Sequence, residues 1–220
     1  MACGAQALGV CSEAEGNSTV ASGDYSHAEG LGTLASSLAS HAEGYVTQAS
    51  GPASHSEGSG ARAIGLHSHA EGQLTRADGI NAHAEGELTQ ATGLDSHAEG
   101  LETIASGQSA HAEGESNTAS GRASHAEGNL NVASGLFAHA EGQRTSALGD
   151  LSHAEGNQTI ASGQNSHAEG TLTTASGFTS HTEGVNTLAN SFFLMQKDKE
   201  LQRTIWKVCT SWGNLVPRMS

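Results

Sequence analysis

The sequence predicts an all-β protein whose short parallel strands wind into a flattened solenoid, with two strands in each coil and about 13 coils. Three observations predict this fold. Histidine recurs every fourteen residues from His27 to His181, each period divides into two similar halves of seven residues, and the apolar residues in these halves are small. A short, strict period is typical of stacked repeats, in which each unit is stabilised mainly by its neighbours.

The composition excludes an ordinary globular core. Of the 220 residues, 29 are glycine and only 4% are aromatic. Large apolar side chains are therefore too few to fill a thick interior at the packing density of a folded protein. A solenoid avoids this problem because its narrow interior can be filled by alanine, serine and threonine.

The charge pattern argues against nucleic acid and membrane partners. The net charge is −14, and no basic stripe that could follow a phosphate backbone is present. The only basic residues before residue 196 are Arg62, Arg76, Arg122 and Arg144. Because no run of about 18 apolar residues occurs, we expect no membrane insertion by a helix.

One half of each period reads Ser-His-Ala-Glu-Gly, as in residues 26–30. Twelve of the thirteen histidines follow this register, and only His67 does not. The glutamate of this half is present in thirteen periods, from Glu15 to Glu183. The other half reads Thr-x-Ala-Ser-Gly. The two halves share one template, Ser/Thr-x-Ala-x-Gly followed by two variable residues, so the structural unit has seven residues.

Seven residues suit a strand of about five residues and a tight turn. Because side chains alternate faces along a strand, Ser/Thr and Ala point inward, and His and Glu, or the variable residue and Ser, point outward. We expect the glycine to supply the positive φ of the corner. Coils that stack at about 4.8 Å form a rod about 60 Å long. A coiled coil shares the seven-residue period, but glycine and serine in every unit disfavour a helix.

Units such as SHAEGNQTIASGQNSHAEG, residues 152–170, resemble the head repeats of trimeric autotransporter adhesins. They are even more similar to the related repeats of phage tail and surface proteins of Gram-positive bacteria. The resemblance covers about residues 5–191 and implies a left-handed parallel β-roll. It also implies a homotrimer with three chains side by side, an extracellular location on a cell surface or virion, and attachment to a host-surface receptor or another fibre component. The expected function is that of a non-enzymatic, trimeric adhesin head or tail-fibre module.

The histidine and glutamate of the repeat are the candidate site residues. Three interpretations of them remain open: a trimer interface, a solvated polar face on a monomeric rod, and an ion-binding ladder at the trimer axis, where converging histidines could hold a divalent transition metal. The residues are His27, Glu29, His41, Glu43, His55, Glu57, His69, Glu71, His83, Glu85, His97, Glu99, His111, Glu113, His125, Glu127, His139, Glu141, His153, Glu155, His167, Glu169, His181 and Glu183.

The regularity of these residues favours the interface. Outward positions of the Thr half vary freely, as in Leu34, Gln48 and Arg62, whereas the His-x-Glu pattern hardly changes. In the adhesin relatives this strand carries apolar residues at the same positions, which implies an interface. Because burial of an unpaired carboxylate is costly, each Glu is expected to form a hydrogen bond with a His, within or between chains.

No catalytic site and no cofactor are expected. Ser26 and His27 are neighbours in a strand, so they face opposite sides and cannot act as nucleophile and base. Twelve equivalent copies also argue for architecture rather than for one active-site cleft. The sequence lacks the motifs of phosphate loops, zinc proteases and nucleophile elbows. It also lacks the calcium-binding nonapeptide, and arginines interrupt the outer column that an ice-binding surface would need.

The composition changes abruptly after residue 190. Large apolar residues appear there, and four of them have the 4-3-4 spacing of one side of an amphipathic helix. We expect a short helical cap that covers the open strand edge and clasps the trimer, or a linker to another component. The chain then divides into a β-roll repeat domain, residues 1–191, and this segment, residues 192–220. The cap residues are Phe192, Phe193, Leu201, Ile205, Val208 and Trp212.

Overall fold

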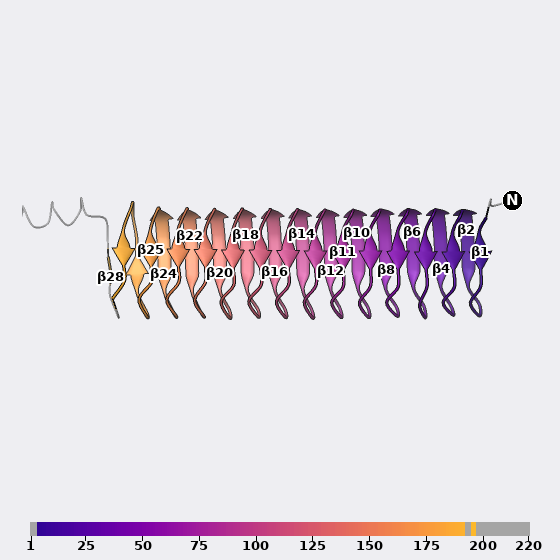
Figure 1. The fold of residues 1–220 in the computed structure, drawn as a ribbon, viewed down its shortest axis with the longest axis horizontal. Coiled ribbons are helices and arrows are strands. Elements are labelled where there is room, and N and C mark those ends of the chain that lie inside the picture. Colours follow the sequence, from indigo (N-terminus) through magenta and orange to yellow (C-terminus); the bar gives the residue numbers. More distant parts are fainter. Residues whose placement is uncertain (1–3, 192–194, 197–220) are drawn as a thin grey trace, which may run out of the picture.

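The computed structural model describes residues 4–191 and 195–196 of the chain. This part is a straight rod of about 13 stacked coils of fourteen residues each, which confirms the predicted parallel β-solenoid (Figure 1). The regular elements of the described residues are all β-strands. The same residues contain no helix that is long and apolar enough to span a membrane.

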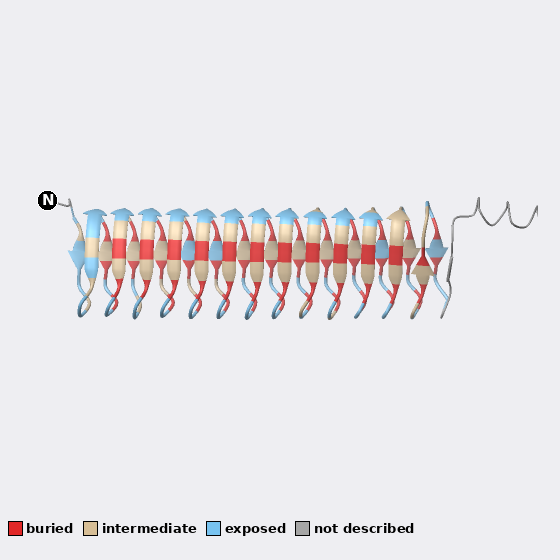
Figure 2. Ribbon diagram, turned by 180° about the vertical axis from the view of Figure 1, so that it is seen from behind, coloured by how far each residue is buried: buried red, intermediate tan, exposed pale blue. Residues whose placement is uncertain are grey.

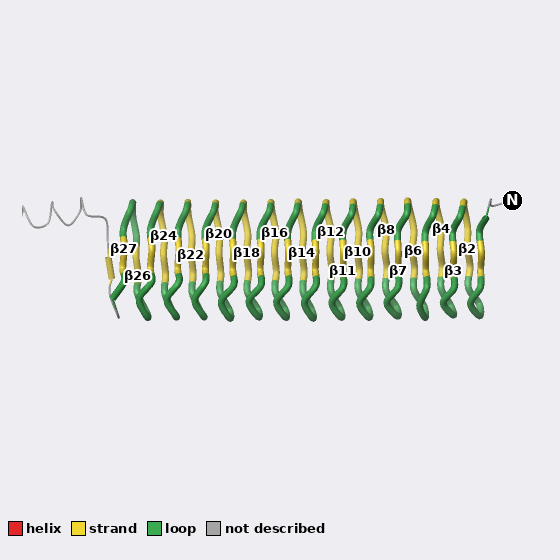
Figure 3. Tube along the Cα trace, viewed as in Figure 1, coloured by secondary structure: helices red, strands yellow, loops and turns green. Residues whose placement is uncertain are grey.

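Two parallel sheets of 14 strands run along the rod, and turns separate their strands (Figure 3). We call them the Thr sheet and the His sheet. The Thr sheet contains β1 (Gln6–Ala7), β3 (Val20–Ala21), β5 (Leu34–Ala35), β7 (Gln48–Ala49), β9 (Arg62–Ala63), β11 (Arg76–Ala77), β13 (Gln90–Ala91), β15 (Ile104–Ala105), β17 (Thr118–Ala119), β19 (Val132–Ala133), β21 (Ser146–Ala147), β23 (Ile160–Ala161), β25 (Thr174–Ala175) and β27 (Leu188–Ala189). The His sheet contains β2 (Glu13–Asn17), β4 (His27–Leu31), β6 (His41–Tyr45), β8 (His55–Ser59), β10 (His69–Gln73), β12 (His83–Glu87), β14 (His97–Leu101), β16 (His111–Glu115), β18 (His125–Asn129), β20 (His139–Gln143), β22 (His153–Asn157), β24 (His167–Thr171), β26 (His181–Thr182) and β28 (Met195–Gln196).

The two halves of the repeat form strands of different length. The strand of about five residues that we expect in each half is present in the His sheet, as in β4, but the strands of the Thr sheet contain only two residues, as in β3. Each strand pairs with the equivalent strand of the next coil. In β10 and β12, His69 lies beside His83 and Glu71 beside Glu85. Every constant position of the repeat therefore becomes a column of like residues parallel to the rod axis.

The interior lies between the two sheets and contains only small side chains. Ala21 of the Thr sheet and Ala28 of the His sheet are fully buried, and the equivalent alanines form the core along the rod. Thr19 and Ser26 are also buried, whereas His27 and Glu29 are not. The predicted inward and outward faces are therefore correct, and Figure 2 shows the buried band inside the rod.

Buried hydroxyl groups hold the two kinds of turn. The Ser26 hydroxyl donates a hydrogen bond to the Gly23 carbonyl at 2.7 Å, and the same bond recurs at Ser54 and Ser166. At the opposite turn, the Thr47 hydroxyl donates to the Glu43 carbonyl at 3.0 Å. In the coils that form these bonds, the Ser or Thr hydroxyl satisfies a carbonyl group where the backbone reverses, and in other coils the same position is occupied by alanine, as at Ala82 and Ala110.

Positive φ angles recur with the seven-residue period of the backbone. In the turns, however, they do not occur at the glycine that we expect. Glycine supplies a positive φ only in the His half, for example at Gly30 with 106°. In the turns, the second variable residue takes the left-handed conformation, as at Tyr25 with φ 57° and Ser18 with φ 56°. The glycine of the Thr half is needed for a different reason. A Cβ atom on Gly107 would lie 2.0 Å from the Gly121 carbonyl oxygen.

The C-terminal expectation lies almost wholly outside the described residues. Phe192, Phe193, Leu201, Ile205, Val208 and Trp212 are all outside them, so the helical cap stays a prediction. Within residues 192–220, β28 adds one strand to the His sheet, where Met195 pairs with His181.

Candidate functional site

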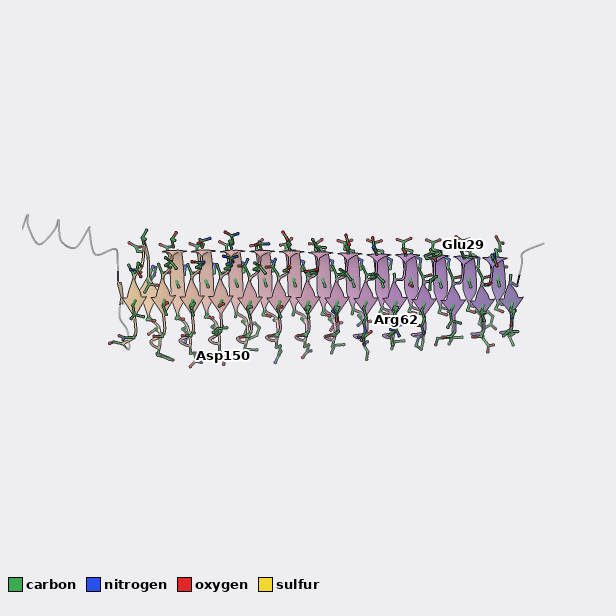
Figure 4. All side chains as sticks on the ribbon, turned by 45° about the horizontal axis from the view of Figure 1, so that its top comes forward. Glu29, Arg62 and Asp150 are labelled. Carbon is green, nitrogen blue, oxygen red and sulfur yellow. The ribbon has the colours of Figure 1, made fainter. Side chains whose placement is uncertain are left out.

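The His sheet places the candidate residues in two parallel columns on the outside of the rod. We call them the His-Glu ladder, which consists of the histidines from His27 to His181 and the glutamates from Glu15 to Glu183 that share one register. Figure 4 shows that Glu29 projects from one long side of the rod and Asp150, in a turn, from the other. All the candidate residues within the described part of the chain are therefore brought together on one face.

The imidazole rings form a continuous stack. Ring centroids of His97 and His111 are 4.8 Å apart, with an interplanar angle of 4°. This arrangement repeats along the column until His181, whose ring is tilted by 51° against that of His167. The stack follows from the strand register, because each ring is carried one strand spacing further along the sheet.

In four coils, those of His69, His139, His167 and His181, the imidazole Nε2 lies within 4.0 Å of carboxylates of two coils. The Nε2 atom of His139 is 3.2 Å from Glu127 Oε1 of the preceding coil and 3.9 Å from Glu141 Oε2 of its own coil. The corresponding distances for His69 are 3.9 Å to Glu57 and 3.8 Å to Glu71. The two oxygens of one carboxylate thus lie beside the histidines of two consecutive coils, as those of Glu71 do with His69 and His83.

The expected His–Glu hydrogen bond forms in the middle of the rod. Nε2 of His111, His125 and His139 lies 3.3, 3.1 and 3.2 Å from the glutamate of the preceding coil. For His55, His69, His83, His97, His167 and His181 the distance is 3.7–4.0 Å, whereas Nε2 of His27, His41 and His153 lies 3.9 Å from the glutamate of its own coil. In those coils Nε2 is inaccessible to solvent and has no hydrogen-bond partner. The ladder is therefore only partly satisfied within one chain.

The glutamates share protons along their column. Hydrogen bonding to the carboxyls of Glu57 and Glu29, together with burial, raises the pKa of Glu43 to about 7. Hydrogen bonding to Glu43 and Glu71 lowers the pKa of Glu57. Neighbouring carboxylates at one strand spacing cannot all ionise without repulsion, and raised and lowered pKa values alternate from Glu43 to Glu113. The other raised values, each about 7, belong to Glu71, Glu99 and Glu155.

Six histidines of the ladder have a lowered pKa, which favours their neutral form. Burial is the largest cause that lowers the pKa of His69, and the neighbouring imidazoles of His55 and His83 lower it further. The nearby carboxylates of Glu57 and Glu85 oppose this shift without reversing it. Burial is also the largest cause of the lowered pKa of His41, His55, His97, His153 and His167.

The ladder is half-covered in a single chain. The side chain of His97 is 35% exposed and that of Glu85 is 32% exposed. Shallow grooves follow the glutamates and the glycines after them, for example along Glu57, Gly58, Glu71 and Gly72. The face is therefore accessible to another chain, to ions and to solvent.

The face does not combine serine with histidine, but it does place possible metal ligands side by side. Ser26 does not contact the ladder, because its hydroxyl is buried and bonded to Gly23 while His27 lies outside. Among the described residues, several groups of two histidines and one glutamate, such as His97, Glu99 and His111, have donor atoms within 4.8 Å of one another. Imidazole and carboxylate are suitable ligands for divalent transition metals.

Sequence reasoning missed a polar ladder inside the rod. Asn117 and Asn131 occupy the buried position that is usually threonine. The Asn131 side chain donates hydrogen bonds to the carbonyls of Glu127 and Gly142 and accepts one from the Thr145 amide at 2.8 Å. The signal in the sequence was the replacement of threonine by asparagine in two consecutive coils.

Comparison with known proteins gives one match. Two segments match the YadA head domain repeat. They are residues 98–124 and 140–166, about a quarter of the chain, and each contains two strands of the Thr sheet, one complete strand of the His sheet and most of another. The adhesin-head resemblance of the repeats is thereby supported. No curated protein matches the chain.

The matched YadA head repeats suggest the coarse role of the rod. Repeats of this family build an adhesin-like structural module rather than an enzyme. The columns of the His-Glu ladder run through both matched segments without interruption.

Proposed function

We propose that this chain is a non-enzymatic attachment module of a cell surface or virion, which works as a homotrimeric rod with the His-Glu ladder of each chain at the shared axis. The observation that carries the proposal is the uniformity of the half-covered ladder. Its residues repeat in every coil, whereas the outward positions of the Thr sheet range from Leu34 to Arg62 and Arg76. A surface that meets the same partner in every layer requires such uniformity.

The unsatisfied imidazoles support the placement at an interface. Nine Nε2 atoms of the described chain are hidden from solvent without a hydrogen-bond partner, and a buried polar atom without a partner is costly. Side chains from two further chains would supply partners and cover the remaining exposed surface. The match to YadA head repeats supports the same arrangement.

The oligomeric state is tested by light scattering after gel filtration. A trimer has a mass of about 67 kDa, three times 22.3 kDa. The paired substitution His97→Arg and His111→Arg should give the mass of a monomer, because cations would face each other across the axis. The matched control is Gln90→Arg with Ile104→Arg, which adds the same charge to the Thr sheet and should leave the trimer intact. A wild-type mass of 22 kDa would contradict the proposal.

In the attachment role, the turns and the Thr sheet contact the partner. These surfaces vary between coils and carry exposed apolar residues such as Leu38 and Ile80, as suits recognition of a host-surface receptor or another fibre component. Labelled protein should bind intact host cells or purified fibre components in a saturable manner. Full retention in solution with both would contradict this role.

Ion binding is the second candidate function. The closely spaced imidazole and carboxylate donors of the described chain favour it, and three histidines from three chains could converge on a divalent ion at the axis. Removal of metal by a chelator would then dissociate the trimer. If the mass is unchanged by a chelator, the trimer does not depend on such ions.

A further inference from the structure

We propose that each single chain binds a row of divalent transition-metal ions along the His-Glu ladder, each held by one imidazole Nε2 and by one oxygen from each of two glutamates in consecutive coils. The proposal deepens the ion-binding candidate above, because it names the ligands and the metal class. It requires only the fold of one chain and does not depend on the trimer.

The donor atoms already have suitable separations. Two ligands of a tetrahedral zinc ion, each bound at about 2.0–2.1 Å, are about 3.3 Å apart. The His139 Nε2 atom lies 3.2 Å from Glu127 Oε1 and 3.9 Å from Glu141 Oε2. For His167 the corresponding distances, to Glu155 and Glu169, are 4.0 and 3.9 Å. Small side-chain rotations would therefore bring one nitrogen and two oxygens to a common ion.

The imidazole stack excludes two histidines of one chain from sharing an ion. The rings of His83, His97 and His111 are parallel within 4° and are 4.8 Å apart. Their Nε2 lone pairs therefore point in parallel directions and do not converge. The carboxylates have the opposite property, because Glu71 presents Oε2 to His69 and Oε1 to His83. Each glutamate can thus bridge two neighbouring ions.

The charge of the ladder sets the number of bound ions, and its donor atoms set the metal selectivity. Thirteen glutamates lie in the column, and each divalent ion balances two of them, so charge neutrality corresponds to about six ions per chain. A bound ion replaces the proton that neighbouring carboxyls otherwise share. One nitrogen and two oxygens favour Cu²⁺, Zn²⁺ or Ni²⁺ over Ca²⁺ and Mg²⁺, which prefer oxygen ligands alone.

Two probes test the proposal on the full chain. Titration calorimetry with Zn²⁺ should saturate near about six ions per chain, whereas Ca²⁺ should give no comparable binding. With Cu²⁺ at low occupancy, the electron paramagnetic resonance spectrum should show hyperfine coupling to one imidazole nitrogen per ion. At high occupancy, neighbouring Cu²⁺ ions should broaden the signal through dipolar coupling.

Matched variants separate the ladder from general acidity. The substitutions Glu99→Gln, Glu113→Gln and Glu127→Gln remove three consecutive carboxylates and should remove about two of the bound ions, one for each pair of carboxylates lost. The control substitutions Glu87→Gln, Glu102→Gln and Glu115→Gln change the charge equally at exposed positions outside the ladder and should leave the number of ions unchanged.

The outcomes also distinguish this proposal from the trimer. Coupling to three equivalent nitrogens would overturn the ligand set proposed here and favour an ion held by three chains. Equal loss of ions from both sets of variants, or no binding of Zn²⁺ and Cu²⁺ at all, would overturn the metal row. The mass of the metal-free protein would report separately on the trimer.

Discussion

The Nε2 atom of His125 lies 3.1 Å from Oε1 of Glu113, the glutamate of the preceding coil. The partners are twelve residues apart in the sequence and belong to the neighbouring strands β18 and β16. The contact therefore links two coils rather than two residues of one strand. It adds a side-chain connection to the backbone ladder along the rod axis.

Replacing Glu113 by Gln should weaken this link. The variant should unfold at a lower temperature in metal-free buffer than wild type, with a loss of about 1 kcal/mol or less because the pair is partly exposed. The control is Glu115→Gln, which removes the same charge at the exposed end of β16 and should have a smaller effect. Thermal denaturation of both variants measures the difference, and equal melting temperatures would mean that the contact contributes nothing measurable.

Removing the protonated glutamates should change how stability depends on pH. A carboxyl whose pKa is raised from 4.5 unfolded to about 7 folded contributes stability that is present below pH 4.5 and is lost as the pH rises through about 7. This applies to Glu43, Glu71, Glu99 and Glu155. With all four replaced by Gln, the melting temperature should rise more steeply than that of wild type between pH 4.5 and 7. Parallel curves for the two proteins would contradict proton sharing in the column.

The ladder histidines His41, His55 and His69 should be neutral at pH 7. Their lowered pKa values, caused mainly by burial, mean that their contribution to stability is present above the unfolded value of about 6.5 and is lost as the pH falls through the folded value. Nuclear magnetic resonance of the imidazole nitrogens should show His41, His55 and His69 titrating below pH 6.5. Titration above that value would contradict the burial of these rings.

Substitution of glycine should show which glycines the packing requires. Gly107→Ala places a Cβ atom 2.0 Å from the Gly121 carbonyl oxygen, so the coils must separate, at a cost of about 1–3 kcal/mol. Gly32 has φ 69° and a Cβ there would meet only Val46 at 3.5 Å. Gly32→Asn should therefore be tolerated, since Asn accepts this conformation. Chemical denaturation compares the two, and equal losses would contradict the distinction.

The hydrogen bonds of the buried asparagine ladder should stabilise the rod, so the loss of stability should depend on which residue replaces Asn131. Asn131→Ala leaves the Gly142 carbonyl without its side-chain donor and the Thr145 amide without its acceptor, at an expected cost of about 1–3 kcal/mol. Asn131→Thr restores the residue that most coils carry and should cost less. Denaturation of both variants tests this order. A more stable alanine variant would show that the bonds of Asn131 do not stabilise the rod.

The sequence by itself determined the unit, the faces and the composition of the interior. Alternation along a strand is local, so the template Ser/Thr-x-Ala-x-Gly was sufficient to place Ala28 inside and His27 outside. The exclusion of a Ser–His catalytic pair follows from the same alternation. The resemblance to adhesin heads also depended only on the repeated letters.

Only the tertiary structure decided the features that depend on contacts with the neighbouring coil, fourteen residues away in the sequence. The two-residue strands of the Thr sheet, the left-handed residues such as Tyr25, and the close approach at Gly107 are set by contacts between coils. The same is true of the pairing of His125 with Glu113 rather than with the glutamate of its own strand. A linear pattern specifies which side chains share a face, but the spacing and stagger of stacked coils decide which of their atoms meet.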